Sequence, residues 1–265
     1  MARSSATPPT GSSEHGAKMR LDLLLVAQGL APTRARAQSL IREGKVCLDG
    51  KVLTKASSAL AEGAALEVTG HDHPWVSRAA LKLVQGLDAF DLSVSNKTCL
   101  DVGASTGGFS QVMLARGARK VYSVDVGHGQ LAQTLRDDAR VVNLEGLNAK
   151  DLSTEHITEP IDLIVSDVSF ISLEKALPQA LALCGPQAHL CVLVKPQFEV
   201  GKGRVGKGGI VKDPALHEEV CTRLSNWLAD QPGWHVIGLT DSPITGSDGN
   251  KEFLLVGHKQ EDPHG

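Results

Sequence analysis

The chain has 265 residues, of which 42% are hydrophobic, and a formal net charge of −3 at pH 7. This length and hydrophobic content are enough for one core of ordinary size and a small second domain. No apolar run approaches the roughly 20 residues that span a bilayer, which excludes a membrane-embedded protein. The five cysteines are scattered without a C-x-x-C pair and predict buried thiols in a reducing compartment, the cytoplasm.

Residues 1–18 are rich in Ser, Thr, Pro and Gly and have no apolar centre. This composition is typical of a disordered leader, and of neither a signal peptide nor an anchor. Beyond the leader the charge is uneven, because residues 18–55 hold eight Lys or Arg against three acids. A basic first domain before an acidic remainder favours nucleic acid as a partner.

Two short helices and a hairpin are predicted in a first domain over residues 19–70. Leucines at helical spacing predict a helix over 20–28, and a second helix follows over 34–43. Asp49-Gly50 between two apolar runs is a hairpin signal, and residues 66–68 supply one more strand.

This combination resembles the RNA-binding domain first known from ribosomal protein S-four. In that family the second helix and the hairpin present basic side chains to structured RNA. The resemblance implies RNA contacts for Arg20, Arg34, Arg36, Arg42, Lys45 and Lys51. A solvated charged surface on a small helical module is the alternative.

Residues 71–76 read as a polar linker interrupted by proline. His71 and His73 have the spacing of metal ligands, but no third ligand follows at a plausible distance. We therefore expect linker histidines in solvent and no metal.

From residue 77 to residue 259 strands and helices alternate, and residues 260–265 form a tail. Strands are expected over 98–102, 120–125, 140–144, 161–167, 189–195, 235–242 and 253–258, and helices between them include 173–184 and 214–230. Such alternation implies a parallel sheet with helices on both faces. The predicted fold class is α/β, a Rossmann-like sheet of seven strands with the last strand antiparallel, as in S-adenosylmethionine (SAM)-dependent methyltransferases, preceded by a small α+β RNA-binding domain.

Residues 98–127 carry the clearest functional signal, namely a strand, a glycine-rich turn, a helix and a second strand that ends in Asp125. The turn lacks the second glycine of the dinucleotide fingerprint, so it favours SAM over a pyrophosphate. Glycines let the backbone approach a ligand, and a strand-end carboxylate can accept the ribose hydroxyls. The expected cofactor residues are Asp101, Gly103, Ala104, Ser105, Thr106, Gly107, Gly108 and Phe109 at the methionine part and Asp125, Val126 and Asn148 at ribose and adenine.

Two later strands end in charged residues, Asp167 and Lys195. Ligands bind at the carboxyl ends of strands in such sheets, so an acid and a lysine are expected side by side in the cleft. The glycine-rich segment after Lys195 nearly matches a P-loop, but Gly208 replaces the magnesium-binding hydroxyl. It is expected to be a mobile lid that binds RNA through Lys202, Arg204 and Lys207, or a plain flexible loop.

The segments VSRAALKL, DVGASTGGF, SDVSFISL, LVKPQFEVGKGRVGKGGIVKDP and SPITGSDGNKEFLL resemble the TlyA family in that order. These proteins are also labelled hemolysin A and are related to the FtsJ/RrmJ methyltransferases. The resemblance implies SAM-dependent 2′-O-methylation of a cytidine ribose in 16S or 23S ribosomal RNA, or in both. It also implies a catalytic tetrad of Lys82, Asp167, Lys195 and Glu252, and Arg78 joins the RNA-contacting set.

Our hypothesis is that Lys195 takes the proton from the ribose hydroxyl. Lys82 would lower the pKa of Lys195 and bind the reacting oxygen, while Asp167 and Glu252 orient the two lysines. The expected partners are ribosomal RNA or ribosomal subunits, without membrane or metal, and a monomer is favoured.

Three other functions remain open from the sequence. A lytic protein would need a membrane span, a cationic amphipathic helix or a secretion signal, and none is evident. A non-catalytic ribosome-assembly factor would keep the SAM fold without using the tetrad. A dinucleotide oxidoreductase is disfavoured by the turn sequence.

Overall fold

The computed structural model describes residues 18–31, 33–68, 73–201, 203–246 and 248–260. Contacts divide the chain into two units, Met1–His71 and Asp72–Gly265. Most of the predicted leader and tail lie outside the described residues, as do the predicted RNA contact Lys202 and the linker residue His71. The other linker histidine, His73, was expected in solvent, but the structure buries it.

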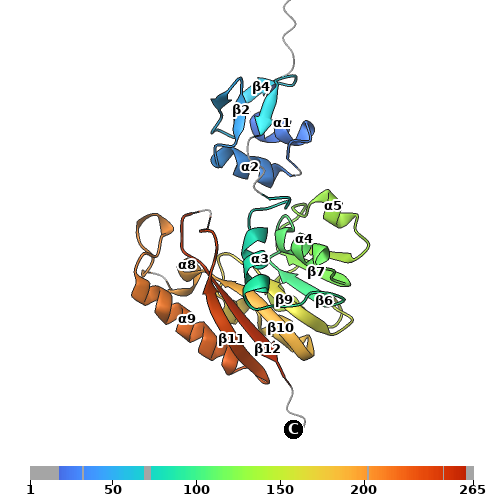
Figure 1. Ribbon diagram of the computed structural model, residues 1–265, viewed down its shortest axis with the longest axis vertical. Helices are drawn as coiled ribbons and strands as arrows, with labels where there is room; N and C mark the ends of the chain where they lie inside the picture. The colour runs from blue at the N-terminus through green and yellow to red at the C-terminus, as the bar shows by residue number, and fades with distance from the viewer. Residues whose placement is uncertain (1–17, 32, 69–72, 202, 247, 261–265) are drawn as a thin grey trace, which may run out of the picture. The chain divides into compact units, whose positions relative to one another are not determined.

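The first unit packs two helices against short strands (Figure 1). Its helices are α1 (Leu21–Ala27) and α2 (Arg34–Arg42), and its strands are β1 (Lys18–Arg20), β2 (Val46–Leu48), β3 (Lys51–Val52), β4 (Ala59–Ala61) and β5 (Leu66–Val68). The hairpin at Asp49-Gly50 forms as predicted, because φ angles of 50° and 74° there match the twist of the β2–β3 pair. The first helix starts one residue later than predicted, since β1 ends at Arg20 and pairs with β4.

The second unit is a seven-stranded sheet in the order β11-β12-β10-β9-β6-β7-β8. Its strands are β6 (Thr98–Val102), β7 (Lys120–Asp125), β8 (Val141–Glu145), β9 (Ile161–Ser166), β10 (Cys184–Val194), β11 (Trp234–Asp241) and β12 (Phe253–Lys259). Strands β6 to β10 pair in parallel, and β12 runs antiparallel between β10 and β11. The predicted α/β architecture with an antiparallel last strand is confirmed.

Helices cover both faces of this sheet (Figure 1). One core cluster joins side chains of α3 (Ala80–Ala89), α4 (Gly108–Ala115) and α5 (Gln133–Arg136) to one face. The other cluster joins those of α6 (Leu173–Ala176), α7 (Pro178–Ala182) and α9 (Pro214–Ala229) to the opposite face. Short helical turns η1 (Ala149–Asp151), α8 (Pro196–Glu199) and η2 (Lys207–Gly209) lie in the connections. Successive side chains of a strand point to opposite faces of the sheet, which explains the two clusters. In β6, Cys99 belongs to the first cluster and Leu100 to the second.

Two elements differ from the prediction by more than one residue at a boundary. The single helix expected over 173–184 is two helices, because Pro178 lacks the N–H that would continue the first one and instead starts α7. Strand β10 begins at Cys184 rather than at residue 189, and its pairing with β9 shifts register between Cys184 and His189. Pro186 lies in that irregular stretch, where a missing strand N–H is tolerated.

Candidate functional site

A cavity of about 550 Å³ opens at the carboxyl ends of β6, β7 and β9. We call it the strand-end cavity. Among the predicted cofactor residues, it is lined by Gly103, Ser105, Asp125, Val126 and Asn148. Its position agrees with the expectation that a doubly wound sheet binds ligands at this edge.

Asp125 organises the rim of the strand-end cavity. Its Oδ2 accepts a hydrogen bond from the Ser105 N–H at 2.8 Å, and its Oδ1 accepts one from the Gly127 N–H at 2.7 Å. A carboxylate has about four lone-pair sites, so it can still accept from a ligand's hydroxyl groups. Val126, next to it, is 65% exposed, which leaves an apolar side chain free for a flat ring.

The other predicted cofactor residues of this segment are buried and do not line the cavity. Gly107 has a φ of 93°, and a Cβ there would lie 2.2 Å from Leu135 Cδ1, so the position requires glycine. Phe109 is part of the core. The remaining members, Ala104, Thr106 and Gly108, are also buried, so these residues shape the turn beneath the cavity.

Asp101 is fully buried at the end of β6, one residue before the cavity wall. Its Oδ2 accepts a hydrogen bond from Ser110 Oγ at 2.7 Å, and Ser110 Oγ lies 2.7 Å from Ser123 Oγ. Its Oδ1 has no hydrogen-bond partner among the residues that the structure describes. Burial raises the pKa of this carboxyl to about 7.

A second cavity, of about 480 Å³, adjoins the first and shares Ser169 and Phe170 with it. We call it the lysine cavity because Lys195 lines it. The Lys195 Nζ lies 2.6 Å from Asp167 Oδ1 and donates to Ser169 Oγ at 2.9 Å. Asp167 lines the strand-end cavity, so this ion pair stands where the two cavities meet.

Lys82 and Glu252 form a second ion pair, although 170 residues separate them in the chain. Lys82 projects from α3, and Glu252 precedes β12 and lines the lysine cavity. Their side chains are only 8% and 2% exposed. Burial raises the pKa of Glu252 above its usual range, whereas Lys82 and Lys195 act to lower it. The four residues implied by the resemblance therefore form two lysine–carboxylate pairs.

Phe170 is a site residue that the sequence analysis did not single out. It is 90% exposed, has a φ of 66° that is rare for a bulky side chain, and lies at the wall common to both cavities. Its ring centroid is 4.9 Å from that of Phe198. An aromatic side chain held out in solvent at this point is available to stack on a ligand.

Asn250 joins two loops, 201–210 and the loop that precedes Glu252, and both contribute residues to the wall of the lysine cavity. Its side chain accepts from the Val211 N–H at 2.9 Å and donates to Gly209 O at 2.9 Å and to Asp248 Oδ2 at 2.8 Å. The residue is fully buried. Loop 201–210, expected as a lid, is therefore tied to the loop that precedes Glu252.

The predicted RNA-binding residues differ in their exposure and in their ion-pair partners. Arg42 and Lys51 are exposed, and no ion pair with another described residue is found for either. Arg36 is instead buried and lies 3.8 Å from Glu43; it belongs to the interior of its unit rather than to the surface.

The other predicted RNA contacts are already engaged or lie elsewhere. Arg20 and Arg34 both pair with Asp22 at 2.9 Å but keep about half of each side chain exposed. Arg204 pairs with Glu219 at 2.5 Å. Lys45 lies 3.5 Å from Glu43, Lys207 is exposed in η2, and Arg78 is partly buried just before α3.

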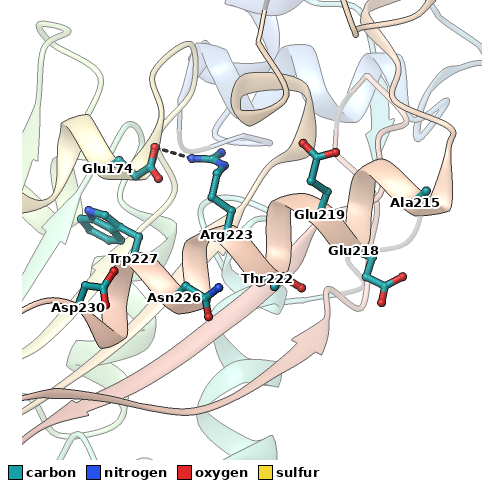
Figure 2. A pocket seen from close by; sticks show the side chains of 9 residues that line it. All are labelled: Glu174, Ala215, Glu218, Glu219, Thr222, Arg223, Asn226, Trp227 and Asp230. Carbon is teal, nitrogen blue, oxygen red and sulfur yellow. Dashed lines mark ion pairs between the residues drawn. The ribbon is translucent and has the colours of Figure 1, made fainter.

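A larger cavity of about 710 Å³ runs along α9 (Figure 2). It contains none of the residues predicted to act on a cofactor or substrate. Arg223 projects from α9 toward Glu174, 2.5 Å away, and also pairs with Glu199 at 2.9 Å. Glu199 ends α8 and accepts from the Leu173 N–H at 2.8 Å, so this network braces the segment that follows Lys195.

Within the described ranges, no helix is long and apolar enough to cross a membrane. The same residues contain no group of three or more His, Cys, Asp or Glu arranged to hold a metal ion.

Comparisons with known proteins agree with this geometry. The FtsJ-like methyltransferase model matches residues 75–259, and the S4 domain model matches residues 19–66. The chain is 47% identical to the 16S/23S rRNA (cytidine-2′-O)-methyltransferase TlyA of Mycobacterium tuberculosis over 92% of this chain and 91% of that one. It is 41% identical to Hemolysin A of Brachyspira hyodysenteriae over 89% of this chain and 98% of that one.

A solved structure of a hemolysin-like protein from Streptococcus thermophilus superimposes with a TM-score of 0.74 at 38% identity, covering 93% of this chain and 90% of that one. The family match extends over most of the chain, and the relatives align along nearly their whole length. The chain belongs to the FtsJ-like methyltransferases and, within them, to the TlyA family, in which an S4 domain precedes the catalytic domain.

Proposed function

We propose that this protein transfers a methyl group from SAM to the ribose 2′-oxygen of a cytidine in ribosomal RNA. The observation that carries the proposal is the junction of the two cavities, where the Lys195–Asp167 ion pair stands between a cofactor-sized space and a substrate-sized space. The S4 domain supplies the RNA-binding surface, and relatives are named for this activity.

SAM fits the strand-end cavity on two observations. Asp125 offers a carboxylate at the rim beside an exposed Val126, as a ribose diol and an adenine ring require. The cofactor, when bound, supplies an electrophilic sulfonium methyl group. The residues that would hold it are Gly103, Ser105, Asp125, Val126 and Asn148.

The two lysine–carboxylate pairs divide the chemistry between them. A ribose hydroxyl must lose its proton as it attacks, so it needs a base within hydrogen-bond reach. Lys195, in its neutral form, takes that proton, and Asp167 and Ser169 hold its nitrogen in place. Lys82, oriented by Glu252, donates a hydrogen bond to the reacting oxygen.

Phe170 completes the substrate site. A ribose inside a helix is out of reach of these lysines, so the target nucleotide must turn out of its stack. The exposed Phe170 ring would stack on the base of that nucleotide and replace part of the lost stacking, which is worth about 1–3 kcal/mol per base.

The test is incubation of the full-length protein with methyl-tritiated SAM and, separately, small and large bacterial ribosomal subunits, followed by mapping of the label. Label on a cytidine 2′-oxygen is expected. Lys195→Ala should lower the rate by at least about 10²-fold, while the Kd for SAM, measured by calorimetry, stays within about twofold. Lys175→Ala, which removes an exposed lysine of α6, is the matched control and should leave the rate unchanged.

Retained turnover in Lys195→Ala would remove that residue from the mechanism. SAM binding without label on either subunit would favour a ribosome-assembly factor instead. A protein that works on ribosomal RNA acts in the bacterial cytoplasm, and we propose that it acts there as a monomer.

A further inference from the structure

The lysine cavity contains an amide and a carboxylate that the methyl transfer does not use. Gln197 lies in α8, two residues after Lys195, and Asp248 lies in the loop before β12. Both line the cavity together with Phe170 and Phe198. The Gln197 Nε2 is 3.4 Å from the Asp248 Oδ2, so the two groups form one polar edge in a space with aromatic walls.

The fold leaves hydrogen-bonding capacity on this edge. Within the described part of the chain, the Gln197 Nε2 makes one hydrogen bond, to Asp248 Oδ2. Asp248 is exposed and accepts from the Asn250 N–H at 3.1 Å and from Asn250 Nδ2 at 2.8 Å. A carboxylate has about four lone-pair sites and a primary amide nitrogen has two protons, so both groups can bond to a ligand as well.

The Asp248 carboxylate also determines which end of the Gln197 side-chain amide faces it. With Nε2 toward Asp248 the contact joins a donor to an acceptor; with the amide reversed, two acceptors would face each other. The edge therefore presents an acceptor beside a donor. Cytosine offers the complement, an amino donor beside a ring-nitrogen acceptor, whereas uracil offers a carbonyl acceptor beside a ring N–H donor and mismatches both groups.

We propose that Asp248 and Gln197 read the Watson–Crick edge of the target base and select cytosine over uracil. The Asp248 carboxylate accepts from the cytosine amino group, and the Gln197 Nε2 donates to the ring nitrogen. This assignment rests on the proposed ribose methylation. It concerns specificity, because neither side chain is needed to move the proton or the methyl group.

The test compares two substrates that differ in one base. Ribosomal subunits are prepared with the mapped nucleotide as cytidine or, after mutation of the rRNA gene, as uridine, and initial rates with tritiated SAM give kcat/KM for each. The unmodified protein should prefer cytidine by roughly 5- to 150-fold, the range for one well-formed pair of base contacts. The amide of Asp248→Asn can turn to suit either base. This variant should therefore lower the ratio of kcat/KM for cytidine to kcat/KM for uridine at least about fivefold.

Gln197→Met, which keeps the volume of the side chain and removes its polar atoms, is the second variant and should narrow the preference in the same direction. Asp241→Asn makes the same chemical change on an exposed residue of β11 outside both cavities and should leave the preference unchanged. If either variant lowered kcat/KM equally for both substrates, Gln197 and Asp248 would only tie α8 to the loop before β12. A ratio of cytidine to uridine kcat/KM that stayed unchanged in both variants would also overturn the assignment. Absence of label on both substrates in the unmodified protein would instead refute the methylation itself.

Discussion

Asp101 has an environment that is unusual for a carboxylate. It stands at the end of β6 beneath the glycine-rich turn, yet it is fully buried, and one of its oxygens lacks a hydrogen-bond partner among the described residues. Burial raises its pKa to about 7, so near neutral pH the carboxyl is partly protonated. A negative charge at this site is unfavourable unless a cation lies close by.

The raised pKa predicts a specific dependence of stability on pH. A carboxyl that titrates near 3.8 in the unfolded chain and near 7 in the folded one stabilises the fold below pH 4, and this contribution is lost as the pH rises to 7. Relative to Asp101→Asn, the free energy of unfolding of the unmodified protein should fall by on the order of 2–4 kcal/mol between pH 4 and pH 8.

Urea unfolding of both proteins without SAM, at intervals across that range, measures the difference. The buried amide of Asp101→Asn adds a constant offset, so the slope against pH carries the information. A difference that stays constant from pH 4 to pH 8 would show that the folded carboxyl titrates at its ordinary pKa.

At the level of elements, Asn250 joins two loops that have little regular structure of their own. Loop 201–210 contains η2, and the loop after β11 carries Asp248 and leads into Glu252. Both contribute walls to the lysine cavity and none to the strand-end cavity. The shape of the substrate space therefore depends on a few hydrogen bonds to one side chain.

Asn250→Ala should separate substrate use from cofactor binding. The change leaves the buried Val211 N–H without its acceptor, at a cost of about 1–3 kcal/mol, and loosens both loops. We expect kcat/KM for ribosomal subunits to fall about tenfold or more, while the Kd for SAM changes less than twofold. Limited proteolysis should cut loop 201–210 faster. Asn226→Ala, an exposed asparagine of α9, is the control, and SAM affinity that falls in parallel with activity would contradict this account.

For the whole molecule, the division of labour between the two units predicts how RNA affinity depends on salt. Arg42 and Lys51 are exposed cations of the S4 unit, and each phosphate contact steepens the fall of affinity with salt. The double variant Arg42→Ala/Lys51→Ala should weaken binding of rRNA and reduce the slope of log K against log salt by about 2.

Filter binding of ribosomal subunits at several salt concentrations measures that slope. Arg116→Ala/Arg140→Ala removes two exposed arginines from the second unit, where they pair with Asp88 and Asp138, and controls for net charge. An equal change of slope in both double variants would mean that only overall charge matters.

Much of this organisation could be predicted from the sequence, because it depends on local pattern. Alternating strands and helices indicated the sheet, and strand ends in a parallel sheet lie at one edge, so Asp125, Asp167 and Lys195 were expected near one another. The two cavities at that edge bring these residues close.

Other features depend on contacts between distant segments or on which way one side chain points. The Lys82–Glu252 pair joins residues 170 apart, and only the family resemblance indicated it. Arg36 follows the same helical pattern as its neighbours, yet it turns into the interior. Composition and periodicity could not predict that Phe170 is exposed or that Gln197 contacts Asp248.

The strand order has a consequence for the newly made chain. Strand β12, the last of the described strands along the chain, lies between β10 and β11 rather than at an edge, and Glu252 immediately precedes it. Until these residues emerge, β10 has one unpaired side and Lys82 has no carboxylate partner. Completion of the sheet and formation of the Lys82–Glu252 pair thus depend on the same short segment, so synthesis must pass residue 259 before both are complete.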